Sequence, residues 1–137
     1  MKAALKYIPV VIVLVTVAAL AEQPVTDHAA ATVANLHDSM LNPPTFVLDA
    51  VYVTKPDKHG NVSVCYEYRS QNVSGGMSAG RAVEDHKGEL STYQVTRTDD
   101  VPGYNAGWVA PCKSKNIDRD ITKAVASAAP ALYKKER

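Results

Sequence analysis

The histidines are the side chains best suited to acid-base chemistry or metal binding, and their spacing favours neither. No two of the four have the i, i+4 or H-x-E spacing that builds a zinc site. No P-loop, G-x-S-x-G, S-x-x-K or dinucleotide motif is present either. We therefore predict no metal site, no cofactor and exposed histidine side chains at every position. The histidines are His28, His37, His59 and His86.

Two adjacent acidic pairs, Glu84-Asp85 and Asp99-Asp100, are the candidates for paired-carboxylate hydrolysis. That chemistry needs one carboxyl group of raised pKa and a second a few ångströms away across a cleft. Neighbouring residues on a strand point to opposite faces, so adjacency does not create such a pair. Both pairs fall at predicted strand ends, and we expect solvated charges rather than catalytic ones.

Three aromatic residues, Tyr93, Tyr104 and Trp108, form the candidate ligand platform, because such rings pack on sugars and peptide side chains. The alternative for Trp108 is packing against a disulfide, because the residue precedes Cys112 by four positions. We favour that packing role and keep Tyr104 and Trp108 as a possible ligand surface.

Cys65 and Cys112 are the only cysteines, and an even pair in an exported chain predicts one disulfide. A redox role would normally show C-x-x-C or a cysteine beside an activating histidine, and neither occurs. In the chain-entropy model a loop of this length contributes about 4 kcal/mol of stability. We expect the bond to staple a small domain.

Residues 1–21 have the composition of a secretory signal peptide. Lys2 and Lys6 supply the positive region, an apolar run follows from residue 7, and Ala19-Leu20-Ala21 forms an A-x-A cleavage signal. The alternative, an uncleaved anchor, would need about 20 apolar residues. We predict cleavage after Ala21 and a periplasmic or secreted product.

Residues 22–137 would then form a single small domain. Loss of Lys2 and Lys6 lowers the formal net charge from +1 to −1, which does not suggest a nucleic-acid binder. The C-terminal end is basic, and it would either touch an anionic membrane surface weakly or complement a helix macrodipole. We favour the macrodipole for these bases, which are Lys134, Lys135 and Arg137.

The periodicity predicts an α+β domain. Helical spacing from Thr26 or Asp27 to Met40 predicts a first helix that Pro43-Pro44 ends. A final helix, capped by Asn116 or Asp118, should carry Ile117, Ile121 and Val125 on one face and end near Pro130.

Between these helices, alternating residues predict a four-stranded antiparallel meander with turns between the strands. The segment 99–111 reads as a Pro/Gly-rich loop. The predicted strands are residues 45–53, 61–71, 77–83 and 90–98.

One part of the chain resembles a group of small exported, largely uncharacterised bacterial proteins. The pattern of that group is L-x-D/N-P-x-S/T-x-x-F, then V-C-x-E/Y-x-x-x-x-N, then G-G. The resemblance implies an envelope or secreted protein and transfers no activity. Within it, Arg69 and Asn72 are a possible partner surface. The residues that carry it are Met40 to Phe46, Val64 to Asn72 and Gly75-Gly76-Met77.

From these features we expect an exported, non-enzymatic domain that binds or supports an envelope protein or ligand. The alternative is a small secreted hydrolase or lyase whose site is assembled only in three dimensions. A histidine held beside a carboxylate in a deep pocket would favour this alternative, and His59 and His86 are its candidates.

Overall fold

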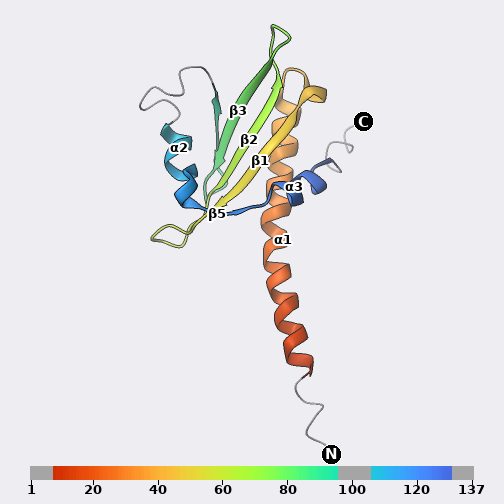
Figure 1. Ribbon diagram of the computed structural model, residues 1–137, viewed down its shortest axis with the longest axis vertical. Helices are drawn as coiled ribbons and strands as arrows, with labels where there is room; N and C mark the ends of the chain where they lie inside the picture. Colours follow the sequence, from red (N-terminus) through yellow and green to blue (C-terminus); the bar gives the residue numbers. More distant parts are fainter. Residues whose placement is uncertain (1–7, 96–105, 131–137) are drawn as a thin grey trace, which may run out of the picture.

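The structure is a computed structural model that describes the backbone of residues 8–95 and 106–130, and the side chains of residues 23–95, 108 and 110–130. It confirms an α+β fold (Figure 1). In chain order the described elements are α1 (Ile8–Ser39), the 3-10 turn η1 (Pro43–Thr45), β1 (Val47–Thr54), β2 (Val64–Gln71), β3 (Met77–Glu84), β4 (Leu90–Gln94), α2 (Ala106–Cys112), the 3-10 turn η2 (Ser114–Asn116), β5 (Ile117–Asp120) and α3 (Thr122–Ala128).

The sheet is antiparallel and has five described strands in the order β4-β3-β2-β1-β5, so the predicted count of four was wrong. Strands β1 to β4 form the predicted meander. The missed strand, β5, pairs with β1 through Tyr52 opposite Asp120 and Val53 opposite Arg119. The helical spacing of Ile117 and Ile121 concealed it, because pairing with a strand about 65 positions earlier in the chain leaves no local pattern.

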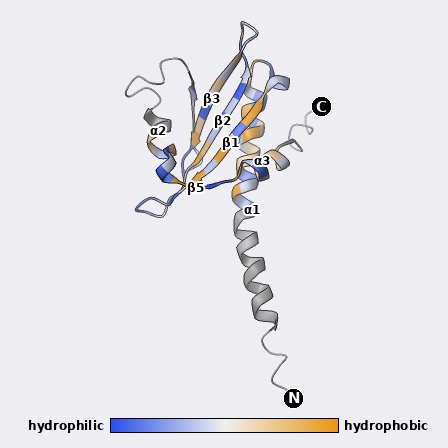
Figure 2. Ribbon diagram, in the orientation of Figure 1, coloured by the Kyte–Doolittle hydropathy of each residue, from blue (hydrophilic) through white to orange (hydrophobic). Residues whose placement is uncertain are grey.

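Two layers cover the two faces of the sheet. Helices α1 and α3 pack on one face, which we call the helix face, around a core cluster that includes Val33, Val51 and Tyr66. Helix α2 packs on the opposite face, which we call the disulfide face, in a smaller cluster around Cys65 and Trp108. Figure 2 shows hydrophobic residues on β1 and on the part of α1 behind the sheet. Helix α2 itself lies within the segment 99–111 that was predicted to be a loop.

A register shift in β1 breaks the predicted alternation. It lies between Leu48 and Ala50, so Leu48 and Val51, three residues apart, both pack against the helix-face core. In β2 the alternation holds: Val64, Tyr66 and Tyr68 face α1, and Cys65 faces α2. Because its side chains alternate without interruption, β2 contributes residues to the cores on both faces of the sheet.

Helix α1 begins much earlier than predicted. It runs continuously from Ile8 to Ser39 through Pro24, and Thr26 and Asp27 lie inside it rather than at its start. Its N-terminal part projects beyond the sheet in Figure 1, and Val25 is the first described side chain that packs against the core. Among the residues whose side chains are described, no helix is long and apolar enough to cross a membrane.

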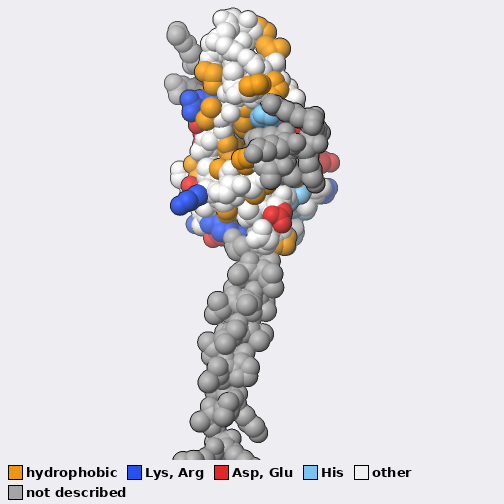
Figure 3. Space-filling view, turned by 90° about the vertical axis from the view of Figure 1, so that its right-hand side faces the viewer, with side chains coloured by type: hydrophobic (Ala, Val, Ile, Leu, Met, Phe, Trp, Pro, Cys, Tyr) orange, Lys and Arg blue, Asp and Glu red, His pale blue; other side chains and the backbone are white. Residues whose placement is uncertain are grey.

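At the other end of the domain, hydrophobic side chains gather on the face shown in Figure 3. Among the residues whose side chains are described, the most exposed large hydrophobic ones are Val73, at 88%, and Leu41, at 68%. Val73 lies in the turn between β2 and β3, and Leu41 lies just after α1.

Candidate binding groove

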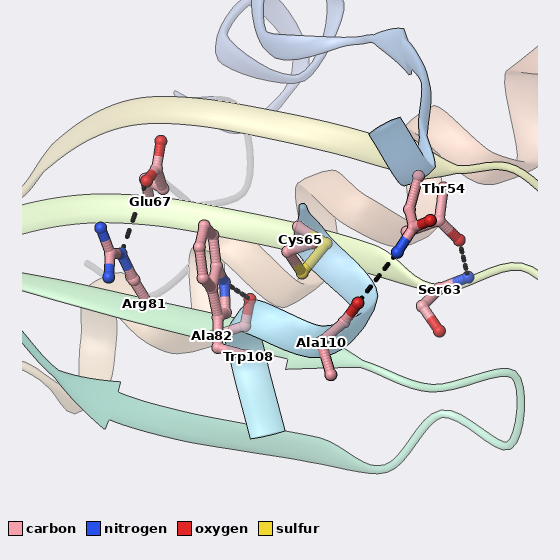
Figure 4. Close-up of a disulfide and its surroundings, with 10 residues drawn as sticks. Thr54, Ser63, Cys65, Glu67, Arg81, Ala82, Trp108 and Ala110 are labelled. Atoms are coloured by element: carbon pink, nitrogen blue, oxygen red, sulfur yellow. Dashed lines mark hydrogen bonds and ion pairs between the residues drawn. A yellow bond between two sulfur atoms is a disulfide. The ribbon is translucent and has the colours of Figure 1, made fainter. Parts of the chain in front are cut away.

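Trp108 packs against the disulfide rather than forming an open platform (Figure 4). It is 8% exposed and shares a cluster with Cys65 and Cys112. Its indole N–H donates to the backbone oxygen of Ala82 on β3 at 3.2 Å. Tyr93 packs at the edge of the same cluster, and Tyr104 lies outside the described residues. The favoured structural role of Trp108 therefore agrees with its surroundings.

The predicted disulfide is present between Cys65 on β2 and Cys112 at the end of α2, with their Cα atoms 6.0 Å apart. Beside it, the Arg81 guanidinium lies 4.5 Å from the centre of the Trp108 ring. The Nε of Arg81 lies 3.5 Å from a carboxylate oxygen of Glu67 (Figure 4). A covalent bond, a buried ring and a cation thus hold α2 to the sheet.

Arg69 and Asn72, the possible partner residues, both have intramolecular partners. Arg69 forms a two-point ion pair with Asp49 across the β1-β2 register, with two N···O distances of 2.8 Å. The Asn72 side-chain oxygen accepts hydrogen bonds from the backbone N–H groups of Ser74 and Gly76, and so shapes the β2-β3 turn. The ion pair uses the Nε and Nη2 groups of Arg69 and leaves the Nη1 group of this exposed side chain for other contacts, so the partner role of the two residues stays a prediction.

Three of the four histidines are exposed, and the fourth, His37, is half-buried. His59 and His86 are exposed, as predicted, and each lies in a turn. His37 is half-buried and bonded to the carboxylate of Asp38 at 2.7 Å, so the prediction of exposure was wrong there. The histidine held against an acid from a distant element is His28, whose side chain is 60% exposed.

Glu84, predicted to be a solvated charge at a strand end, is buried instead, with 6% exposure. The Nε2 of His28 lies 2.6 Å from one carboxylate oxygen of Glu84, and the Thr32 hydroxyl donates to the other at 3.0 Å. The prediction failed because α1 crosses the end of β3, which residues near Glu84 in the sequence do not reveal. Its neighbour Asp85 fits the expectation better: its carboxylate accepts the backbone N–H groups of the following turn.

Tyr66 completes this polar cluster under α1. Its hydroxyl is buried without a hydrogen bond of ordinary geometry, although Thr32 and Glu84 are close enough to affect its titration. Burial, and to a smaller extent the charge of Glu84, raise the pKa of Tyr66 far above its ordinary value. The Tyr66 hydroxyl is therefore neutral at physiological pH.

A groove of about 400 Å³ opens on the helix face, beside the C-terminal end of α1. Its size lies within the range of about 300–1,000 Å³ that is usual for small-ligand sites. Its described lining combines uncharged polar residues with two tyrosines and a methionine, and none of these residues carries a carboxylate, ammonium or guanidinium group. The lining residues are Met40, Tyr68, Ser70, Ser78, Ala79, Gly80, Thr92, Tyr93 and Gln94.

Gly80 sets the shape of the groove floor. A Cβ atom at this position would lie 2.4 Å from the Cε2 atom of Tyr68, which is the residue opposite Gly80 in the β2-β3 register. Only glycine lets the Tyr68 ring lie this close to the β3 backbone. Burial also raises the pKa of Tyr68, so its hydroxyl stays protonated.

Ser70 and Ser78 stand directly opposite each other on β2 and β3. The Ser70 hydroxyl donates to the sulfur of Met40 at 3.2 Å, and the Ser78 hydroxyl accepts from the Asn72 amide at 2.9 Å. Sequence reasoning missed this pair. Two features of the sequence could have revealed it. On the face of β2 that carries Tyr66 and Tyr68, the residues change from apolar to polar at Ser70, and β3 and β4 carry polar residues near the same end of the sheet.

The described residues contain no group of three or more His, Cys, Asp or Glu side chains that could hold a metal ion. Comparison of the chain with known proteins finds no matching family model, curated protein or solved structure. The functional argument is therefore built on the geometry of the groove and the cluster around Glu84.

Proposed function

We propose that the protein is an exported, non-enzymatic domain that binds a component of the cell envelope or the surrounding medium through the groove. The observation that carries this proposal is the composition of the groove, whose described lining residues have hydrogen-bonding side chains and include no charged acid or base. General acid-base catalysis needs a group that changes protonation near the working pH. The serine, threonine and glutamine side chains of this groove can form hydrogen bonds with a ligand, but they do not change protonation near neutral pH.

Export is supported by the signal-like residues 1–21 and by the disulfide, which is typical of an oxidising compartment. Pro24 adds a physical argument. A proline inside a helix costs about 3 kcal/mol or more, whereas the first turn tolerates it. Cleavage after Ala21 would move Pro24 from the interior of α1 to its first turn.

Intact mass of the protein recovered after expression of the full chain tests export. We expect the mass of a chain that begins at Glu22. Its two cysteine thiols should react with an alkylating agent only after reduction. A retained N-terminus with two free thiols would contradict the proposal.

A pull-down from envelope extract tests binding. The exported protein is compared with a Ser70→Ala/Ser78→Ala variant, and Ser91→Ala serves as the control because Ser91 is an exposed serine outside the groove. We expect the protein and the control to recover the same partner and the groove variant to lose it. Repeated recovery of no specific partner, or equal recovery by all three proteins, would reject the proposal.

The second candidate is a small hydrolase or lyase centred on His28. It is favoured by the 2.6 Å contact between His28 and the buried carboxylate of Glu84, because a carboxylate that orients a histidine is a general-base arrangement. It predicts turnover of chromogenic esters or glycosides that His28→Ala abolishes and Ser78→Ala leaves unchanged. Absence of turnover, or turnover that survives His28→Ala, rejects this candidate.

A membrane-surface role for the basic residues 131–137 is a separate proposal, and these residues lie outside the described part of the chain. It predicts that the exported protein sediments with anionic liposomes and is released by salt. Binding that persists after deletion of residues 131–137 would reject it.

A further inference from the structure

We infer that the ligand of the groove is a neutral, hydroxyl-bearing sugar. This inference rests on the proposed function and adds the ligand class. Its basis is the arrangement of the two facing serines, together with the uncharged polar side chains of Thr92 and Gln94 on β4.

The existing bonds of the two serines give them opposite preferences. Ser78 already accepts a hydrogen bond from Asn72, and its proton takes part in no bond with a described residue. Ser70 already donates to the sulfur of Met40, and its lone pairs accept no hydrogen bond from a described residue. Ser78 is therefore set to donate to a ligand, and Ser70 is set to accept from one.

The direction of the Asn72 amide is fixed by its other contacts. Its oxygen accepts the backbone N–H groups of Ser74 and Gly76, so its nitrogen must be the group that faces Ser78. Since an NH₂ group can only donate, the Ser78 oxygen must accept. The turn between β2 and β3 thus orients a hydroxyl in the groove.

A sugar hydroxyl matches this pair because it donates and accepts at the same time. One ligand hydroxyl, or two neighbouring ones, can accept from Ser78 and donate to Ser70. Thr92 and Gln94, exposed on β4, provide further uncharged donors and acceptors along the groove. The Tyr68 ring, which is 7% exposed and stacked on Phe46, closes the floor of the groove beneath these polar groups and leaves little apolar surface for a ligand.

Charge selectivity follows from the lining. None of the described residues that line the groove carries a carboxylate, ammonium or guanidinium group. A charged ligand would lose hydration without gaining an opposite charge, which makes its entry unfavourable. The groove should therefore prefer a neutral sugar over its acidic or amino counterpart.

Titration of the isotope-labelled exported protein, followed by amide NMR, tests this assignment. The probes are cellobiose and N,N′-diacetylchitobiose, with glucuronate and glucosamine as charged counterparts and the tripeptide Gly-Gln-Gly as a carboxamide source. We expect a neutral disaccharide to shift the amide signals of residues 70, 78, 92 and 94. Glucuronate and glucosamine should leave these signals unchanged.

Variants make the test specific. Ser78→Ala and Ser70→Ala should each weaken disaccharide binding about 3- to 10-fold, which is the effect of losing one hydrogen bond. Ser91→Ala, outside the groove, should bind like the unchanged protein. Equal binding by Ser78→Ala, or stronger shifts with the charged sugars or with Gly-Gln-Gly, would overturn the assignment.

The sugar titration and the pull-down can fail separately. If neither disaccharide shifts the groove signals while Ser70→Ala/Ser78→Ala still loses its partner from extract, the sugar assignment fails and the proposed binding function stands. If the groove variant also keeps its partner, both fail.

Discussion

The two faces of the sheet are covered by different means. On the helix face, α1 and α3 bury a core of thirteen residues that includes Val33, Val51 and Val125. On the disulfide face, α2 has seven residues and contributes to a cluster in which four of the described residues are buried. A helix this short cannot hold its position by burial alone, and the covalent bond to Cys65 compensates for the small apolar area.

The faces also differ in where polar groups lie. On the helix face they are inside: Glu84, Thr32 and Tyr66 are buried between α1 and the sheet, and the groove opens near the other end of β3, at Ser78 to Gly80. On the disulfide face the ion pair of Arg81 and Glu67 lies at the edge of a half-covered cluster. The comparison teaches that the face with the larger core can accommodate a groove, whereas the face with the smaller core serves mainly for attachment.

Removing the disulfide should have the largest effect. A Cys65→Ala/Cys112→Ala variant frees a loop of 47 positions and should lose about 4 kcal/mol of unfolding free energy. Urea unfolding followed by circular dichroism measures this loss. The unchanged protein with its disulfide reduced, unfolded in the presence of a reductant, is the matched control and should lose a similar amount relative to the oxidised protein. A loss below about 1 kcal/mol would show that burial alone holds the disulfide face.

Gly80→Ala tests the packing of the groove floor and should rank second. The new Cβ atom would meet the Tyr68 ring at 2.4 Å, and overpacking of this kind costs about 1–3 kcal/mol. Removing the ring in a Gly80→Ala/Tyr68→Leu variant should recover part of the loss relative to Tyr68→Leu alone. Additive effects of the two substitutions in thermal unfolding would show that this contact does not set the floor.

Substitutions at two members of the buried polar cluster should change the unfolding free energy by unequal amounts. Glu84→Gln removes a carboxylate that two side chains contact, and it should cost about 1–3 kcal/mol. Tyr66→Phe removes a buried hydroxyl without an ordinary hydrogen bond, and it should change stability by less than about 1 kcal/mol in either direction. Urea unfolding of both variants checks the order. A larger loss for Tyr66→Phe would mean that its hydroxyl is satisfied.

Arg81→Met tests the cation above Trp108 on the disulfide face. The substitution keeps an apolar stem but removes the charge, and a partly exposed cation–π contact contributes about 0.5–1 kcal/mol. Trp108 fluorescence reports the local change, and unfolding measures the cost. If Arg81→Lys matches Arg81→Met, the planar guanidinium rather than the charge makes the contact.

The smallest effect concerns Asp120, the acid that ends β5 two residues before α3 begins. Hydrogen bonds from the hydroxyl and backbone N–H of Thr122 lower the pKa of Asp120 below 3.8. Since the folded-state pKa is the lower one, its contribution is complete above the ordinary carboxyl pKa and is lost as the pH falls through the lowered value. Unfolding free energies measured at neutral and acidic pH should therefore fall less for Asp120→Asn than for the unchanged protein. An unchanged acid loss would assign that decline to other carboxylates.

The limits of sequence reasoning are visible in particular residues. The alternation in β2 and the turn at Asn72 depend on neighbours in the chain, and both were predictable. The contact of His28 with Glu84 joins residues 56 positions apart, and the pair of Ser70 and Ser78 depends on strand register. No local pattern carries either one, so Glu84 was expected to be solvated and the pair of Ser70 and Ser78 was missed.

By itself, the sequence determined the α+β class and the meander, because periodicity and turn residues are local signals. It also determined the disulfide partners, because two cysteines allow only one pairing. Only the tertiary structure decided that β5 pairs with β1, that Glu84 is buried beneath α1, and that Gly80 makes room for the Tyr68 ring. These features depend on which distant segments come into contact, and that choice is made by burial and backbone pairing across the whole domain.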